Sequence, residues 1–127
     1  MIILDENIRA DQRIALRAKR VPIHQIGFDL GHEGIKDEQI IPFLHTLRDT
    51  TFFSRDEDFG KRHLVHPRYC LVSLLVEQDD VAKFVLRVLR HPELKTKAKR
   101  MASVIRVSYE GMSIWRRNAE HVRYVYW

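Results

Sequence analysis

Four aspartates in the first half of the chain lie where short apolar runs begin or end. They are Asp5, Asp37, Asp56 and Asp58. Carboxylate oxygens are the ligands that Mg²⁺ and Mn²⁺ prefer, and the ends of adjacent parallel strands bring distant carboxylates within a few ångströms of each other. The pattern therefore predicts a divalent-metal site at one edge of a sheet.

Each aspartate also has a purely structural interpretation. Asp5 and Asp37 stand where helix N-caps belong, and a capping carboxylate needs no metal. Asp56 and Asp58 suit a polar surface turn after a strand. Carboxylates that cluster without a counter-ion repel one another, so a meeting of Asp5 with Asp56 would favour a bound cation. The joint placement of the four residues separates the two interpretations.

Other reactive residues point to less specialised roles. His63 and His66 have a spacing that suits one zinc ion, but no cysteine pair or second histidine pair accompanies them, so we expect a surface loop. The single cysteine, Cys70, excludes an internal disulfide, and its apolar neighbours indicate a buried structural thiol. The chain contains no glycine-rich phosphate loop, and Ser54 lies in no nucleophile-elbow motif.

The composition is that of one globular domain. The chain has 127 residues, of which 45% are hydrophobic and 31% charged, so we expect a single domain over residues 1–127 with a real core. No apolar run approaches the roughly 18 residues that cross a bilayer, and the first residues lack the features of a signal peptide. We therefore expect a cytoplasmic protein.

The net charge of +5 is unevenly distributed. Residues 1–60 contain 8 Lys and Arg against 11 Asp and Glu, whereas residues 95–127 contain 8 against 2. An acidic pocket that holds metal beside a basic surface that holds phosphate is what a nuclease needs. Basic surfaces also occur on proteins that bind no nucleic acid, so this pattern favours RNA only together with the aspartates.

Alternating strands and helices must position these side chains. The first helix should bury Ile8 and Ile14, and Pro42 should kink the second helix or delay its start. This order predicts a parallel α/β sandwich whose right-handed crossovers place the first and third strands side by side. We expect strands over residues 2–4, 21–26, 50–54 and 69–76, helices over about 8–20, 37–47 and 81–90, and a hairpin formed by 103–109 and 112–115.

The last six residues alternate aromatic and aliphatic side chains. Such a stripe, over residues 122–127, is typical of an edge strand or of an interface. It predicts either pairing at the border of the sheet or a homodimer contact.

Three motifs in residues 1–60 resemble those of the PIN-like family, which includes small VapC-type toxin-like ribonucleases. Their order and spacing are similar to the LDEN, DxEI and RDxDF series of that family, and the rest of the chain matches loosely. The motifs are Leu4-Asp5-Glu6-Asn7, Asp37-Glu38-Gln39-Ile40-Ile41 and Ser54-Arg55-Asp56-Glu57-Asp58-Phe59.

The resemblance implies a three-layer α/β/α sandwich with a mainly parallel sheet and a C-terminal β-hairpin. It also implies a Mg²⁺- or Mn²⁺-dependent endoribonuclease, the toxin-like component of a toxin–antitoxin pair, with RNA as substrate and a small antitoxin protein as partner. The alternative is a catalytically inactive PIN-like module that binds RNA or a protein partner. By position, the metal-binding and catalytic carboxylates would be Asp5, Asp37, Asp56 and Asp58, and the substrate contacts would be Asn7, Ser54 and Arg55.

Overall fold

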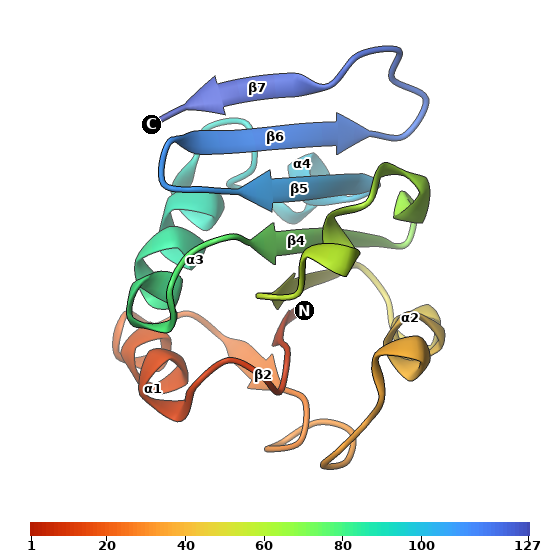
Figure 1. Ribbon diagram of the computed structural model, residues 1–127. Helices are drawn as coiled ribbons and strands as arrows, with labels where there is room; N and C mark the ends of the chain where they lie inside the picture. The colour runs from red at the N-terminus through yellow and green to blue at the C-terminus, as the bar shows by residue number, and fades with distance from the viewer.

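A single seven-stranded sheet runs through the computed structural model, which describes residues 1–127 (Figure 1). The strand order is β2-β1-β3-β4-β5-β6-β7; the first five strands are parallel, and β6 and β7 are antiparallel to their neighbours. The strands are β1 (Ile2–Leu4), β2 (Ile23–Gln25), β3 (Thr50–Ser54), β4 (Tyr69–Leu74), β5 (Ser103–Val107), β6 (Gly111–Arg116) and β7 (Arg123–Tyr126). The fold is therefore α/β with a mostly parallel sheet and a C-terminal hairpin.

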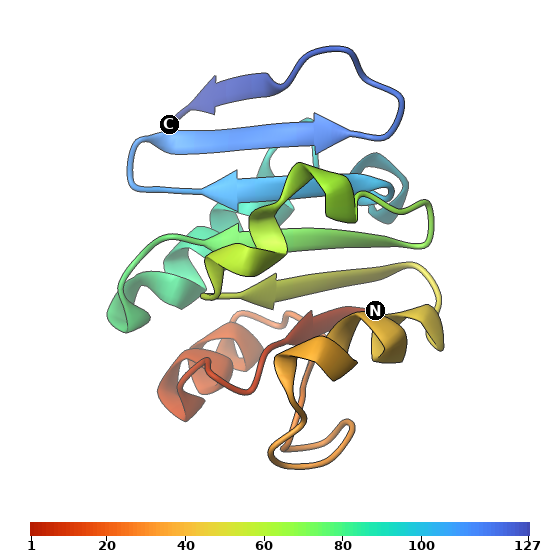
Figure 2. The same ribbon diagram turned by 45° about the vertical axis from the view of Figure 1, so that its right-hand side comes forward.

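Helices lie on both faces of this sheet. Helices α1 and α3 pack together on one face, whereas α2 and the short 3₁₀ helix η1 lie on the other (Figure 2). The α-helices are α1 (Ala10–Ala18), α2 (Asp37–His45), α3 (Val81–Arg90) and α4 (Lys97–Arg100), and the 3₁₀ helices are η1 (Glu57–Gly60), η2 (Arg62–Leu64) and η3 (Gln78–Asp80). None of the helices combines the length and the apolarity needed to cross a membrane.

The two faces of the sheet carry separate apolar cores. Neighbouring residues of a strand point to opposite faces, so Phe53 belongs to the core beneath α1 and α3 while Phe52 belongs to the core beneath α2 and η1. The Phe52 ring meets Phe59 of η1 edge to face, with the ring centroids 5.2 Å apart. Burial on both faces explains why β3 is a continuous apolar and β-branched run.

The first helix buries a different side from the expected one. Ile14 is 61% exposed, and the buried residues of α1 are Gln12 and Leu16. The Gln12 side-chain oxygen accepts a hydrogen bond from the Ala82 backbone nitrogen at 2.9 Å, in the first turn of α3. Because that nitrogen has no partner within its own helix, a polar residue is favoured in the contact between α1 and α3.

The second helix begins at Asp37, where it was expected to begin, so Pro42 does not delay its start. Pro42 cannot donate a hydrogen bond to the Glu38 carbonyl one turn earlier. Both residues are exposed, so water can reach that carbonyl. The position of Pro42 on the solvent side makes it tolerable inside the helix.

The C-terminal residues form an edge strand, as one of the two expectations had it. β7 pairs only with β6, and its Tyr124 and Tyr126 side chains are 63% and 79% exposed. Trp127 is fixed at the end of the strand, because its indole nitrogen donates a hydrogen bond to the Ser108 carbonyl at 2.8 Å. Its ring also lies beside Phe84 of α3, with the centroids 6.0 Å apart.

Cys70 should resist thiol reagents in the folded protein. It is fully buried in β4, and burial raises the pKa of its thiol to about 11. At pH 8 we expect its reaction with Ellman's reagent to be at least about 1000-fold slower than in denaturant, since the thiol reacts only when the sheet opens. One rapidly titrating thiol per native chain would contradict this packing.

Candidate functional site

The carboxyl ends of β1 and β3 lie side by side. Leu4 pairs with Phe53, and the Asp5 backbone nitrogen continues the pairing with a 2.8 Å hydrogen bond to the Phe53 carbonyl. The next residues of the two strands are therefore neighbours, and these are Asp5 and Ser54. Parallel strands end at the same edge of a sheet, where ligand sites of open α/β folds form.

Ser54 links the first and third predicted carboxylates. Its hydroxyl donates a 2.6 Å hydrogen bond to Asp5 Oδ2 and accepts one from the Asp56 backbone nitrogen at 3.0 Å. Asp56 Oδ1 in turn accepts a hydrogen bond from the Asp58 nitrogen at 2.9 Å, which caps η1. Ser54 was expected to contact the substrate, but it is fully buried and its hydroxyl contacts the Asp5 carboxylate.

The Asp5 carboxyl group lies in an environment that disfavours its charge. Burial is the largest cause and raises the pKa of Asp5 above its ordinary value. Hydrogen bonds from Ser54 and from the Glu6 backbone nitrogen act in the opposite direction without cancelling it, and the negative charges of Asp56 and Glu6 raise the pKa further. Like charges in this site are incompletely compensated by the protein itself.

Asp37 reaches the same place from the start of α2. Although the residue is exposed, loss of water around its carboxyl group is the largest cause that raises its pKa. A hydrogen bond with the Asp56 carboxyl group comes next, followed by the charges of Asp56, Asp5 and Asp58. All four predicted aspartates therefore interact electrostatically at one edge of the sheet.

Glu6 holds the loop that delivers Asp37. Both of its carboxylate oxygens accept hydrogen bonds from the Gly34 nitrogen, at 3.1 and 3.0 Å. Gly27 makes room for this contact, because a Cβ atom there would lie 2.9 Å from Glu6 Cδ. Glu6 is thus a tether across the loop between β2 and α2 rather than a freely solvated charge, and no sequence signal pointed to it.

The donor set suits a hard divalent cation, although the side chains are not arranged around a single point. The aspartates offer only oxygen donors, as Mg²⁺ and Mn²⁺ prefer. No group of three or more His, Cys, Asp or Glu side chains has the spacing that holds a metal ion. Asp58 lies at the exposed rim, where its Oδ1 is 3.2 Å from Lys61 Nζ. Loss of water is the largest cause that raises the pKa values of Asp5 and Asp37, and the neighbouring negative charges raise them further. A cation would relieve that repulsion.

Two predicted substrate contacts lie beside the loop that follows β4. Arg55 Nε donates a hydrogen bond to the Val76 carbonyl at 3.0 Å, which fixes the guanidinium group near the site. The Asn7 carbonyl accepts a hydrogen bond from the Gln78 side chain at 2.5 Å, and Asn7 itself is exposed. Ser54, Arg55 and Asn7 thus surround the carboxylates, but only Ser54 touches them.

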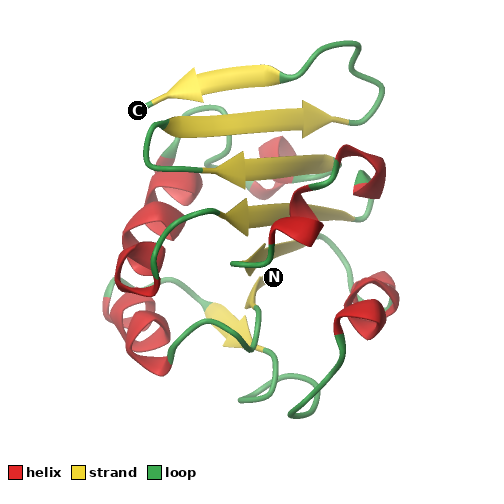
Figure 3. Cartoon of the chain, viewed as in Figure 1, coloured by secondary structure: helices red, strands yellow, loops and turns green.

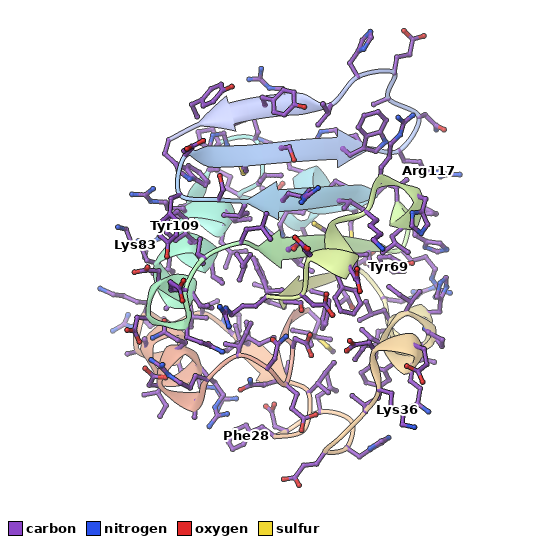
Figure 4. The ribbon with its side chains drawn as sticks, viewed as in Figure 1. Phe28, Lys36, Tyr69, Lys83, Tyr109 and Arg117 are labelled. Atoms are coloured by element: carbon purple, nitrogen blue, oxygen red, sulfur yellow. The ribbon has the colours of Figure 1, made fainter.

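Two of the seven histidines lie at the opposite edge of the sheet, beside Tyr69, the first residue of β4 (Figure 4). His66 stacks on Tyr69 with the ring centroids 4.8 Å apart, and it meets His45 edge to face at 4.4 Å. Burial is the largest cause that lowers the pKa of His66. His63 lies outside this cluster and is exposed, as expected for a surface loop. His45 and Tyr69 are distant in sequence, so their spacing predicted nothing.

Loss of the Ser54 hydroxyl should destabilise the metal-free protein. Ser54→Ala removes the donor to Asp5 Oδ2 and the acceptor of the Asp56 nitrogen, so we expect a loss of about 1–3 kcal/mol at pH 7.5 in EDTA. The loss should shrink at low pH, where Asp5 is protonated and the hydrogen bond no longer stabilises a charge. Urea denaturation measures both values, with Ser113→Ala as the matched control because Ser113 is half-buried and makes no such bond. Equal losses at both pH values would contradict the role of the Asp5 charge.

Removal of the Asp37 charge should instead stabilise the metal-free protein. The folded-state pKa of Asp37 is raised, so near pH 3 the residue is protonated in both states and Asp37→Asn changes little. As the pH rises through that pKa, repulsion develops in the folded wild type only, and the variant should become more stable by on the order of 0.5 kcal/mol after screening. Thermal unfolding in EDTA from pH 3 to 7.5 measures the difference. A variant that is less stable at neutral pH would contradict the proposed repulsion.

Comparison with known proteins places the chain in no family. No family model matches its sequence, and neither a curated protein nor a solved structure matches it. Its function therefore has to be inferred from its own residues, above all from the aspartates that residues 1–60 bring to one edge of the sheet.

Proposed function

We propose that this chain is a PIN-like endoribonuclease that depends on Mg²⁺ or Mn²⁺ and has a three-layer α/β/α fold. The observation that carries the proposal is the meeting of Asp5, Asp37 and Asp56 at the carboxyl ends of β1 and β3. These residues come from separate parts of the chain, and burial together with their mutual charges raises the pKa values of Asp5 and Asp37. A fold seldom maintains such repulsion without a functional reason.

RNA is the substrate that best fits the excess of basic residues in the last part of the chain. The acidic residues converge at the site, whereas the basic residues are concentrated after residue 95. Phosphodiester hydrolysis needs this division, because the cation acts on one phosphate while Lys and Arg hold the flanking backbone. The resemblance of residues 1–60 to toxin-like ribonucleases supports RNA rather than DNA, and a small antitoxin protein as a partner.

The proposed mechanism assigns a task to each side chain of the site. Asp5 and Asp56 are placed to hold the cation, with Ser54 fixing the direction of Asp5. Asp37 and Asp58, at the solvent side, are placed to hold a second ion or to orient the attacking water. The hydrogen bond of Arg55 to Val76 uses Nε, which leaves the terminal nitrogens for the scissile phosphate. A divalent cation bound there would lower the pKa of a bound water and would stabilise the charge that develops on the phosphate.

A catalytically inactive PIN-like module that binds a protein partner is the second candidate. Two observations favour it. No group of three or more His, Cys, Asp or Glu side chains has the spacing that holds a metal ion. A groove of about 770 Å³ also lies beside α1 and α3. The groove has an apolar floor and a basic rim, which suits an acidic amphipathic segment such as an antitoxin would offer. Its lining includes Ala15, Ala82, Leu86 and Trp127 in the floor and Lys19, Lys83, Arg87 and Arg90 at the rim.

Cleavage of labelled RNA by Asp56→Asn tests the enzyme against the binding module. We expect the wild type to cleave with Mn²⁺ and not with EDTA, and the variant to lose at least about 100-fold in rate because a direct ligand is removed. Glu57→Gln is the matched control, since Glu57 is the exposed neighbour in η1 and the change in charge is the same. Circular dichroism should show both variants folded.

The same assay distinguishes the two candidates. Equal rates for Asp56→Asn and Glu57→Gln would reject the metal site. No cleavage by the folded wild type in Mn²⁺, together with no heat of Mn²⁺ binding in calorimetry, would favour the inactive module.

A further inference from the structure

On the side of the sheet that bears η1, no α-helix covers β5, β6 and β7 (Figure 3). Only the short 3₁₀ helices η1 and η2 reach β5 and β6 on this face. Paired residues of neighbouring strands share a face, so Arg106, Ser113 and Tyr124 lie side by side across the three strands. Val104 and Trp115 form the adjacent pair on the same face, whereas residues 112 and 114 point into the opposite core.

Two hollows on this face join into one trough. The first, of about 300 Å³, lies between η1 and β6, and the second, of about 400 Å³, lies over β5 to β7. Arg106 and Ser113 line both hollows, so the two are continuous. We call this surface the β5–β7 trough and define it by Lys61, Arg62, Arg106, Trp115, Tyr124 and Tyr126.

The trough has more positive than negative side chains, and most of the positive charge lies in the hollow next to η1. The Arg62 guanidinium carbon lies 3.6 Å from the centroid of the Trp115 ring and has no carboxylate partner. Arg106 is exposed and also lacks an ion pair. Its aliphatic stem crosses Gly60, where a Cβ atom would lie 2.9 Å from Arg106 Cγ. Glu110 is the only carboxylate in the lining.

Exposed aromatic rings accompany these cations. Tyr124 and Tyr126 are among the most exposed large side chains of the protein, and Trp115 is half-buried beneath Arg62. Aromatic rings beside cations are the arrangement that single-stranded nucleic acids use, because bases stack on rings and phosphates pair with Lys and Arg. A duplex keeps its base faces stacked internally and cannot use the rings.

The trough is connected to the aspartates by η1. This helix begins after its cap Asp56 and ends at Gly60, which lines the trough. Four residues of 3₁₀ helix span about 8 Å, so a continuous strand of RNA can contact both places. Lys61 joins them directly, since it lines the trough and pairs with Asp58.

We propose that the β5–β7 trough binds single-stranded RNA and leads it to the aspartates, a proposal that rests on the proposed nuclease function. The bases stack on Tyr124 and Tyr126, the phosphates pair with Arg62 and Arg106, and the Trp115 ring supports the Arg62 guanidinium group.

Binding of a fluorescein-labelled oligouridine of about 12 nucleotides, followed by anisotropy in EDTA, tests the trough apart from cleavage. We expect Tyr124→Ala and Trp115→Ala each to weaken binding about tenfold, and Arg106→Gln to weaken it and reduce the salt slope by about one between roughly 50 and 200 mM KCl. Tyr124 is 63% exposed on the edge strand, so its variant should fold even if the Trp115 variant does not. Lys95→Gln, in the exposed segment between α3 and α4, is the control and should bind like the wild type, because Lys95 lines none of the hollows.

The result separates this proposal from the nuclease itself. Binding that is lost in Lys95→Gln but kept in the trough variants, or that is as tight for a blunt duplex, would overturn the trough. Absence of oligouridine binding by the wild type would overturn it too. Asp56→Asn should retain binding and lose cleavage. Binding without cleavage by the wild type in Mn²⁺ would reject the nuclease and keep the trough, whereas cleavage with unchanged rates in all trough variants would do the reverse.

Discussion

The hydrogen bond between Ser54 Oγ and Asp5 Oδ2 joins two strand ends that lie 49 residues apart in the chain. It depends on the parallel pairing of β1 with β3, which sets the register so that these residues follow Leu4 and Phe53 at the same edge. The rest of the candidate site extends this contact. The Asp56 backbone nitrogen donates a hydrogen bond to the same hydroxyl, and the Asp56 carboxyl group raises the pKa of Asp37. A shift of one residue in that register would turn Asp5 to the other face of the sheet and disperse the site.

Much of the sheet could be predicted from the sequence because its parallel strands are buried on both faces. Such strands read as continuous apolar runs, and β3 has the predicted bounds, Thr50–Ser54. The burial of α3 was equally clear from its helical spacing. The exposed side of α1 could not be predicted in this way, because Ile14 remains in solvent. The guanidinium carbons of Arg13 and Arg17 instead lie 3.6 and 5.5 Å from the centroid of the exposed Phe28 ring. Pattern analysis ranks residues by polarity, and here polar contacts between elements determined which side faces inward.

The candidate site was predictable to the extent that sheet topology determines it. Parallel strands must end together, so the approach of Asp56 to Asp5 follows from the order of the elements alone. The hydrogen bonds between Glu6 and Gly34 and between Arg55 and Val76 depend on loop conformations. No sequence pattern predicts those conformations. The uncovered face of β5 to β7 was also hidden, because it results from the absence of a helix after β5 rather than from any motif.

The position of β4 between β3 and β5 has a consequence during synthesis. The aspartates lie within the first 58 residues, but until residues 69–74 have left the ribosome β3 remains an open edge with its two phenylalanines unburied. The ring-bearing edge strand β7 is the last segment to emerge. During translation the nascent chain therefore exposes an unpaired strand edge and apolar side chains, both of which promote aggregation. Chaperones are expected to protect this surface until the C-terminal hairpin has paired with β5.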